Sequence, residues 1–270
     1  MAAQTGNFCA LRGGYAWDMT EHNGVIRLAM WSGPRNISTA MMRSFGNRPD
    51  TVVIDEPLYA HYLHATGIDH PGRDEVLKAG QTDWHKAVAV LLGPMPQGKS
   101  VFYQKHMAQH LLSGMDLGWI DSLTNCFLIR DPREMMTSFI KVIPDPSAEQ
   151  LGLPQQVELF ERECTRTGRV PPVIDSRDVL ENPRGVLGAL CERVGIRFDA
   201  AMLTWPAGPR TTDGVWARHW YANVERSTGF GRYQPKDAQV PDELMPIYET
   251  CKACYERLAV HRIVCEEGMC

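Results

Sequence analysis

The sequence predicts an α/β protein in which helices flank a parallel β-sheet in three layers. Short apolar segments of four to seven residues alternate with longer segments whose apolar residues recur at helical spacing. Such alternation favours parallel strands, because each helix carries the chain back to the start of the next strand. Polar residues follow several of the apolar segments, and ligands of such sheets bind beyond the carboxyl ends of the strands.

Five strands are expected, at residues 25–31, 51–54, 100–104, 125–130 and 173–176. Helices are expected at residues 38–45, 58–63, 74–92, 105–112, 132–142, 148–167, 183–194 and 242–264. Residues 1–22 show no period and predict a flexible arm. Residues 23–270 predict a single domain that includes a C-terminal lid segment and helix.

Bulk composition narrows the class of protein. Apolar residues make up 44% of the 270 residues, enough for a large core, and the net charge is −4. A nucleic-acid-binding protein usually carries a basic field, so no nucleic-acid partner is expected. No apolar run approaches the ~18 residues of a membrane span. The chain is therefore expected to be cytoplasmic, with no membrane partner; a homo-oligomer is compatible with this composition.

Histidine and cysteine spacing gives little indication of a metal. The eight cysteines are expected to be reduced thiols. Four of them could form a zinc site only if two pairs converged, but the first pair lies inside the helix expected at 242–264; the four are Cys251, Cys254, Cys265 and Cys270. His61 and His64 lie one helical turn apart without an evident third ligand. No metal is predicted.

The segment 25–45 organises the chain. A buried strand leads through a tight turn at Gly33 and Pro34 to a helix that begins near Ser38 and Thr39. Such a turn directs free backbone N–H groups and the helix dipole at one point, where a phosphate or sulfate binds well. Arg35 adds a fixed charge. The alternative is an ordinary strand-to-helix connection with Ser38 or Thr39 as the cap.

Residues 93–100 (Gly-Pro-Met-Pro-Gln-Gly-Lys-Ser) match the phosphate-loop pattern of ATP- and GTP-using proteins. That loop needs a strand before it and a helix after it, whereas the order here is reversed. Two prolines also remove backbone N–H donors. We interpret the segment as a helix-to-strand turn.

A second basic position follows the fourth strand. Arg130 lies at the strand end, and Ser138 lies two helical turns further on. An arginine there can bind a phosphate through two N–H groups, and the serine can donate a hydroxyl to the same group. Alternatively, Arg130 pairs with Asp131 or Asp55 and Ser138 lies on a helix surface.

With these two motifs the chain resembles the P-loop-like sulfotransferases, as a small bacterial-type member. These enzymes use 3′-phosphoadenosine 5′-phosphosulfate (PAPS) and release 3′-phosphoadenosine 5′-phosphate (PAP). Residues 34–39 resemble the family's 5′-phosphosulfate loop, Arg130 and Ser138 its 3′-phosphate pair, and residues 173–198 its later strand–helix unit. The resemblance covers about residues 25–230.

The resemblance implies a sulfotransferase fold and PAPS as the donor, without a metal. It places these residues at PAPS: Gly33, Pro34, Arg35, Asn36, Ile37, Ser38, Thr39, Arg130, Ser138, Arg226, Ser227, Thr228 and Gly229. Three positions depart from the family pattern, which usually has Lys at Arg35, Gly at Ile37 and often an aromatic residue at Ala40. Adenine would then stack elsewhere, with Trp31 and Phe230 as candidates.

The resemblance also implies the reaction. A sulfuryl group would pass from PAPS to a hydroxyl or amine of a small-molecule acceptor. Arg35 would act at the 5′ side, and Lys105 would reach the transferred group.

Two residues are candidates for the base that removes the acceptor proton. Glu56 matches the glutamate that follows the second strand in related enzymes, and His106 approximates a Lys-Thr-His run of the cytosolic branch. Glu56 is favoured, because its motif aligns without a gap. The structural alternatives are a salt bridge or helix cap for Glu56 and a helix-face position for His106.

The acceptor side is expected to be aromatic. Tyr59, Tyr62 and Trp84 are candidates to line the acceptor pocket, and residues 213–230 predict a lid whose Arg226–Gly229 part closes over the nucleotide. Two other functions remain open: an ATP- or GTP-dependent kinase or hydrolase that uses residues 93–100, and a nucleotide-binding protein without catalysis.

Overall fold

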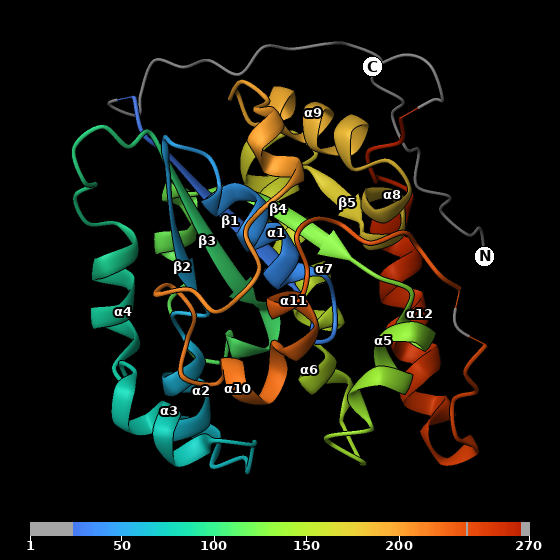
Figure 1. Ribbon diagram of the computed structural model, residues 1–270. Coiled ribbons are helices and arrows are strands. Elements are labelled where there is room, and N and C mark those ends of the chain that lie inside the picture. The colour runs from blue at the N-terminus through green and yellow to red at the C-terminus, as the bar shows by residue number, and fades with distance from the viewer. Residues whose placement is uncertain (1–23, 236, 266–270) are drawn as a thin grey trace, which may run out of the picture.

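The computed structural model describes residues 24–235 and 237–265, so the arm predicted for residues 1–22 lies outside the described residues (Figure 1). Five parallel strands form one sheet in the order β2-β3-β1-β4-β5. They are β1 (Ile26–Ser32), β2 (Thr51–Asp55), β3 (Val101–Met107), β4 (Thr124–Ile129) and β5 (Val173–Asp175). The predicted parallel α/β sheet is confirmed.

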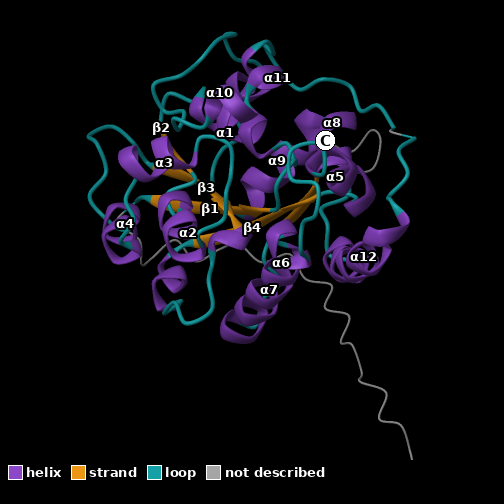
Figure 2. Cartoon of the chain, turned by 90° about the horizontal axis from the view of Figure 1, so that it is seen from below, coloured by secondary structure: helices purple, strands orange, loops and turns teal. Residues whose placement is uncertain are grey.

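Helices cover both faces of the sheet, as Figure 2 shows. On one face, Leu28 and Met30 of β1 pack against Met41 and Phe45 of α1 (Ser38–Gly46) and against α9 (Pro183–Arg193). On the other face, the alternate β1 side chain Trp31 lies in a core with three helices: α4 (Trp84–Leu91), α7 (Leu153–Thr167) and α12 (Met245–Ala259). Side chains that alternate along β1 therefore build two separate cores.

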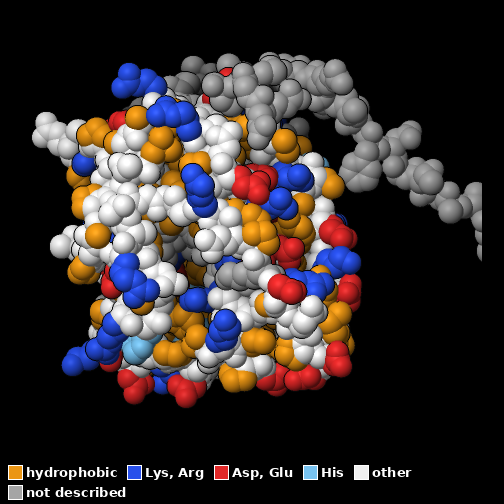
Figure 3. All heavy atoms as spheres, turned by 45° about the vertical axis from the view of Figure 1, so that its right-hand side comes forward, with side chains coloured by type: hydrophobic (Ala, Val, Ile, Leu, Met, Phe, Trp, Pro, Cys, Tyr) orange, Lys and Arg blue, Asp and Glu red, His pale blue; other side chains and the backbone are white. Residues whose placement is uncertain are grey.

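The remaining helices are short. They are α2 (Tyr59–Thr66), α3 (Arg73–Ala79), α5 (Pro132–Phe139), α6 (Ala148–Leu151), α8 (Ser176–Glu181), α10 (Ala217–Trp220) and α11 (Ala222–Glu225), with 3₁₀ turns at Ala108–His110, Gly118–Ser122, Ala200–Leu203 and Asp242–Leu244. Among the described residues, no helix is long and apolar enough to cross a membrane. On the face in Figure 3, Lys and Arg side chains are interspersed with Asp and Glu.

Glycine divides two of the predicted helices. The helix expected at 74–92 is α3 followed by α4, and the break begins at Gly80, where a Cβ would lie 2.5 Å from the Cβ of Ala60. The helix expected at 148–167 is α6 followed by α7, because Gly152 has a φ of 72° and ends the first helix. Helix α12 ends at Ala259 rather than at residue 264.

The helix predicted at 105–112 is wrong. Strand β3 continues to Met107, all seven of its residues are buried, and only the 3₁₀ turn Ala108–His110 follows. The reason is register: β1 extends to Ser32, and its last residues pair with β3, with Met30 opposite Lys105 and Trp31 opposite His106. Lys105 and His106 therefore point to opposite faces of the sheet.

Candidate active site

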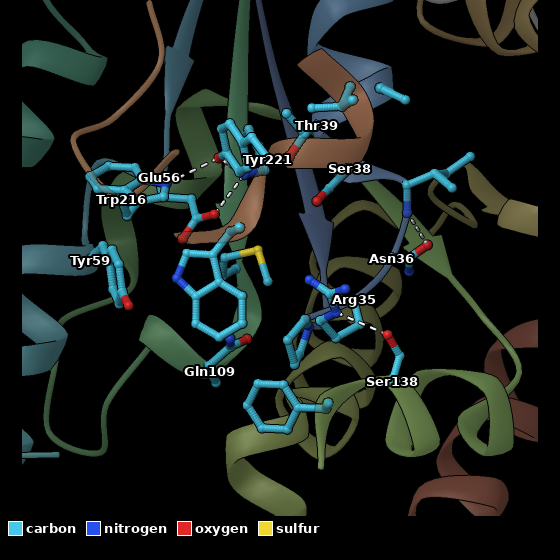
Figure 4. Close-up of a pocket in the computed structure, with 18 of the residues that line it drawn as sticks. Arg35, Asn36, Ser38, Thr39, Glu56, Tyr59, Gln109, Ser138, Trp216 and Tyr221 are labelled. Atoms are coloured by element: carbon cyan, nitrogen blue, oxygen red, sulfur yellow. Dashed lines mark hydrogen bonds and ion pairs between the residues drawn. The ribbon is translucent and has the colours of Figure 1, made fainter. Parts of the chain in front are cut away.

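A cavity of about 290 Å³ lies at the carboxyl edge of the sheet, beside the ends of β1 to β4. Figure 4 shows Arg35, Asn36, Ser38, Thr39 and Ser138 on one side of it, and Glu56, Tyr59, Trp216 and Tyr221 on the other. The further lining residues are Pro34, Ile37, Ala40, His70, Lys105, Met107, Gln109, His110, Arg130, Phe139, Trp220, Asn223 and Val224. The sequence thus predicted correctly which edge of the sheet carries the cavity.

Close packing and hydrogen bonds fix the β1–α1 turn. Gly33 does not line the cavity; a Cβ there would lie 2.5 Å from the carbonyl oxygen of Leu151, so this glycine permits close packing. Asn36 donates to the Leu128 carbonyl (3.0 Å) and accepts from the backbone N–H of Ile37 (2.9 Å). Arg35 takes the left-handed conformation, with a φ of 58°. The turn is held rigidly in the shape that it needs to face the cavity.

Helix α1 presents its uncapped end to the cavity. Its N-cap residue, Ile37, provides no side-chain hydrogen bond, so neither Ser38 nor Thr39 is the cap that the ordinary connection would have. Ser38, Thr39 and Ala40 occupy the first turn and line the cavity. The first-turn N–H groups of a helix have no partner within the helix, and the helix dipole makes them attractive to an anion.

Two arginines stand beside this helix end. Arg35 donates from Nε to Ser138 Oγ (3.0 Å) and forms no ion pair with a described residue. Burial and the neighbouring Arg130 charge lower the pKa of Arg35. Two arginine side chains meet at the first turn of α1, and such an arrangement suits an anion. We call this end of the cavity the candidate anion site.

Arg130 has a partner that the sequence did not suggest. It pairs with Glu134 (2.8 Å), not with Asp131 or Asp55, and donates from Nη1 to the Arg35 carbonyl (2.5 Å). Glu134 also accepts from the Tyr233 hydroxyl (2.6 Å). These bonds occupy three of the five guanidinium N–H groups and orient Arg130 toward the cavity, with two N–H groups unused among the described residues.

The opposite end of the cavity carries a carboxylate. Glu56 has a φ of 42°, and its Oε1 accepts from Lys105 Nζ at 2.6 Å. Burial raises the pKa of Glu56, and the nearby Asp55 charge adds to this, against the opposing effect of Lys105. A carboxylate with a raised pKa is a better proton acceptor near neutral pH.

Lys105 is fully engaged within the protein. Its ammonium donates to Glu56, to Asp55 Oδ1 (2.9 Å) and to the Tyr221 hydroxyl (2.6 Å), which uses its three N–H groups. Its side chain is 1% exposed. In this arrangement Lys105 organises the carboxylates, and it reaches a transferred group only by giving up one of these bonds.

His106 and Trp31 do not line the cavity. Both lie on the opposite face of the sheet, where their rings stack with centroids 4.3 Å apart. His106 is 1% exposed, and burial lowers its pKa to about 3. Trp31 is fully buried and donates to Asn125. In this geometry His106 cannot reach an acceptor as its base, and Trp31 cannot stack on an adenine ring in the cavity.

Aromatic and histidine rings form the wall beside Glu56. Tyr59 lines the cavity and stacks on His110 (5.0 Å), and its hydroxyl lies 3.0 Å from His70 Nδ1. Tyr62 and Trp84, the other expected acceptor residues, do not line it. Burial lowers the pKa of both His70 and His110, which favours their neutral imidazole forms.

The late segment contributes different residues from those predicted. Arg226, Ser227, Thr228 and Gly229 do not line the cavity, because residues 204–205 hold this stretch: Gly229 bridges with Thr204, Thr228 accepts from the Trp205 backbone, and Ser227 from its indole N–H. Phe230 packs edge-on against Trp205. The preceding residues, Trp216 to Val224, close the cavity instead. In the sequence, only the aromatic residues of this segment indicated that it closes the cavity.

The phosphate-loop look-alike lies at the other end of the sheet. Residues 93–100 connect α4 to the first residue of β3, at the amino edge, and Lys99 donates to the Pro49 carbonyl (2.6 Å). The helix-before, strand-after context is confirmed. This segment shares no residue with the cavity.

The cysteines and histidines show no metal cluster where the structure describes them. Cys251 and Cys254 lie within α12, and Cys270 lies outside the described residues. His61 Nδ1 pairs with the Thr82 carbonyl (2.9 Å). No three potential ligands come together within 24–235 and 237–265.

Several known proteins are similar to this chain. Two proteins of Arabidopsis thaliana, branched-chain-amino-acid aminotransferase-like proteins 1 and 2, are 39% and 36% identical over 86% of this chain. The chain covers 41% of the length of each. Those names describe the relatives alone.

Solved structures show a weaker likeness. A sulfotransferase domain from the Synechococcus PCC 7002 olefin synthase matches with a TM-score of 0.46 and 16% identity, covering 87% of this chain and 98% of that one. A sulfotransferase from Alicyclobacillus acidocaldarius matches with a TM-score of 0.48 and 13% identity, covering 87% and 96%.

The assignment rests on a family model, that of the sulfotransferase domain, which matches residues 26–254. This range contains the whole sheet, the β1–α1 turn and every cavity residue. The chain belongs to the sulfotransferase domain family.

Proposed function

We propose that this protein transfers a sulfuryl group from PAPS to a hydroxyl or amine of a small-molecule acceptor. The candidate anion site at the first turn of α1 would hold the phosphate side of PAPS, and Glu56 would remove the acceptor proton. That the protein acts in the cytoplasm and that it needs no metal stay predictions, and the composition remains compatible with a homo-oligomer.

One observation supports the proposal most directly. Arg35, without a carboxylate partner among the described residues, stands next to Arg130 and the uncapped end of α1, and all three face one cavity. A cavity that gathers unneutralised positive charge fits an anionic ligand. The donor set consists of N–H and O–H groups, which suits the oxygen atoms of phosphate and sulfate. The residues present therefore fit PAPS.

Each end of the cavity has its own task in this proposal. PAPS supplies an activated sulfuryl group. At the anion end, Arg35 and the N–H groups of Ser38 and Thr39 stabilise the charge that grows on the departing phosphate. Arg130 and Ser138 bind the oxygen atoms of a second phosphate group, and Glu134 holds Arg130 in place.

At the carboxylate end, Glu56 accepts the proton of the acceptor hydroxyl or amine. Its Oε1 is already fixed by Lys105, which limits the orientations open to the carboxylate. The aromatic wall at Tyr59, Trp216 and Trp220 excludes water and contacts the acceptor. Lys105 stays bound to the protein and does not touch the sulfuryl group.

The first experiment measures ligand binding to the full chain by calorimetry and thermal shift, with PAP, PAPS, ATP and GTP. We expect PAP and PAPS to stabilise the protein, by about 2.7 kcal/mol at ~100 Kd, and ATP and GTP to do so only at far higher concentrations. Binding of ATP in preference to PAP would contradict the proposed donor. Transfer is then sought with labelled PAPS and a panel of hydroxyl and amine compounds; PAP binding without any transfer would indicate a binding protein.

A further inference from the structure

The carboxylate beside Glu56 is buried outside the cavity. Asp55 ends β2, its side chain is 2% exposed, and it is absent from the cavity lining, whereas Glu56 lines the cavity. Two adjacent acidic residues at one strand end therefore have different surroundings. One can meet a substrate and the other cannot.

Asp55 makes four contacts with three donors. Oδ1 accepts from Lys105 Nζ (2.9 Å) and lies 2.9 Å from the Tyr221 hydroxyl; Oδ2 lies 2.7 Å from that hydroxyl and accepts from the Gly214 backbone N–H (3.1 Å). The Tyr221 hydroxyl also accepts from Lys105 and from the Trp216 indole N–H (3.0 Å). Since lysine and indole N–H groups only donate, the tyrosine proton must go to Asp55.

The same network holds the segment that closes the cavity. Gly214, Trp216 and Tyr221 belong to residues 213–221, and all three are tied directly or through one atom to Asp55. A separate buried ion pair, Arg43–Asp213 (2.7 Å), ties the start of that segment to α1. An ion pair between Arg218 and Glu75 ties it to α3 as well. The segment thus has anchors besides Asp55, and Arg43–Asp213 is one that does not touch Lys105.

We propose that Asp55 is a positioning residue for Glu56: it acts through Lys105 and Tyr221 and touches neither PAPS nor the acceptor. The inference rests on the proposed role of Glu56. Without Asp55, Lys105 would have Glu56 as its sole carboxylate partner among the described residues. With Asp55, Lys105 is shared, so Glu56 keeps the basicity that proton removal requires.

Four groups face Glu56 from the elements packed around it. Lys105 comes from β3, Asp55 from β2, Tyr59 from α2 and Tyr221 from the cavity-closing segment. Lys105 lowers the pKa of Glu56, and the Asp55 charge raises it. Removal of the Asp55 charge must therefore shift the titration of Glu56 to lower pH.

The test follows Glu56 directly, in the full chain without ligand. Glutamate is labelled with ¹³C at its carboxyl carbon, and the Glu56 signal is identified by its loss in Glu56→Gln. In Asp55→Asn we expect the Glu56 titration midpoint to fall by about one pH unit. PAP affinity should stay within about threefold, because Asp55 lies outside the candidate anion site.

Asp213→Asn is the matched control, because it weakens a different anchor of residues 213–221, one without contact to Lys105. It should lower the melting temperature and leave the Glu56 midpoint in place. An unchanged midpoint in Asp55→Asn, or an equal shift in both variants, would overturn the proposal. If Asp55→Asn does not fold, Lys105→Met gives the opposite test: its Glu56 midpoint must rise, and an unmoved midpoint would equally overturn the inference.

The titration needs no acceptor and no transfer. A shifted midpoint together with absent PAP binding would leave the coupling intact and refute the proposed function. PAP binding together with an unshifted midpoint would refute the coupling and leave the proposed function intact.

Discussion

Arg35 and Glu56 share an unusual backbone conformation. Within the described residues they are the non-glycine residues with a positive φ, 58° and 42°, and both line the cavity. Such conformations cost about 1–3 kcal/mol each and persist only where surrounding contacts impose them. Here backbone atoms of both residues are hydrogen-bonded: Arg130 donates to the Arg35 carbonyl, the Glu56 N–H donates to the Lys105 carbonyl (3.0 Å), and the Glu56 carbonyl accepts from the Tyr59 N–H (3.0 Å). The strain lies at the two residues to which we assign charge stabilisation and proton removal.

Glu56→Gln tests the proposed base. It keeps the side-chain shape and removes the proton acceptor, so sulfuryl transfer should fall by about 10²–10⁴-fold while PAP affinity stays nearly unchanged. The measurement is the rate with labelled PAPS and any acceptor found in the panel. His106→Asn is the comparison, and its loss of activity should be the smaller, because His106 lies on the other face of the sheet. The reverse ranking would remove Glu56 from the mechanism.

The same variant has a stability signature. A carboxyl group whose pKa is raised on folding stabilises the fold while protonated, and this contribution disappears as pH rises through the folded pKa. Glu56→Gln cannot ionise, so its melting temperature should exceed that of the parent at about pH 8 and approach it at about pH 4. A variant less stable than the parent across this range would show that the Lys105 pair outweighs the burial of the charge.

Arg130→Ala tests the anion end. Loss of a charge-assisted contact is worth about 1.5–3 kcal/mol, so PAP affinity should fall about tenfold to a hundredfold. The melting temperature without ligand should also fall, because the Arg130–Glu134 ion pair is lost. Lys99→Ala in the phosphate-loop look-alike is the control and should leave PAP affinity within about twofold. Calorimetric titration with PAP compares the two variants. A large loss of PAP affinity in Lys99→Ala would show that the phosphate binds at residues 93–100 instead.

At the scale of elements, the β1–α1 turn depends on what lies beneath it. The junction of α6 and α7 passes so close to Gly33 that a Cβ would lie 2.5 Å from the Leu151 carbonyl oxygen, and the sulfur of Met135 in α5 would lie 3.1 Å away. The candidate anion site is therefore positioned by a helix pair more than a hundred residues later in the chain. Neither element could shift without moving the turn.

Gly33→Ala should destabilise the protein by about 1–3 kcal/mol, because the neighbouring backbone has to move. PAP affinity should fall with it, since the first turn of α1 moves too. The matched control is Gly188→Ala in α9, where a Cβ meets nothing within 4 Å. That variant should be unchanged or more stable by about 0.4–1 kcal/mol. Chemical denaturation of both variants gives the comparison; equal stability would refute the packing explanation.

At the scale of the whole molecule, buried histidines couple stability to pH. Burial lowers the pKa of His70, His106 and His110, and that of His106 to about 3. At these three positions the unfolded chain binds more protons than the folded protein below about pH 6.5, so the histidines withdraw stability as pH falls through this range. The site and the core contribute to this sensitivity together.

The melting temperature should thus fall steadily from about pH 7 to about pH 5, and His106→Phe should flatten this dependence by removing one buried imidazole. His85→Gln serves as the control, because the His85 side chain is 73% exposed and its loss should leave the slope unchanged. Differential scanning calorimetry across this pH range measures the melting temperatures of the parent and both variants. A parent protein with a flat profile would contradict the expectation.

The sequence by itself determined the class of fold and most of the residues that meet at the α1 end of the cavity. Strands and helices follow from local periodicity, which neighbouring residues carry. The turn at residues 33–39 and Arg130 after β4 also depend on short segments, because a strand end places the following residues at a known edge of the sheet. The helix before residues 93–100 and the strand after them, which rule against a phosphate loop, were likewise predictable from the local sequence.

Only the tertiary structure decided the carboxylate end. Register between β1 and β3 extended the strand through Lys105 and His106 and sent them to opposite faces, and one residue of register reverses every such assignment. The partners of Lys105 come from Asp55, Glu56 and Tyr221, up to 116 residues away. Which part of the late segment closes the cavity, Trp216–Val224 rather than Arg226–Gly229, likewise depends on long-range contacts with Asp55 and Trp205, and local sequence carries no record of them.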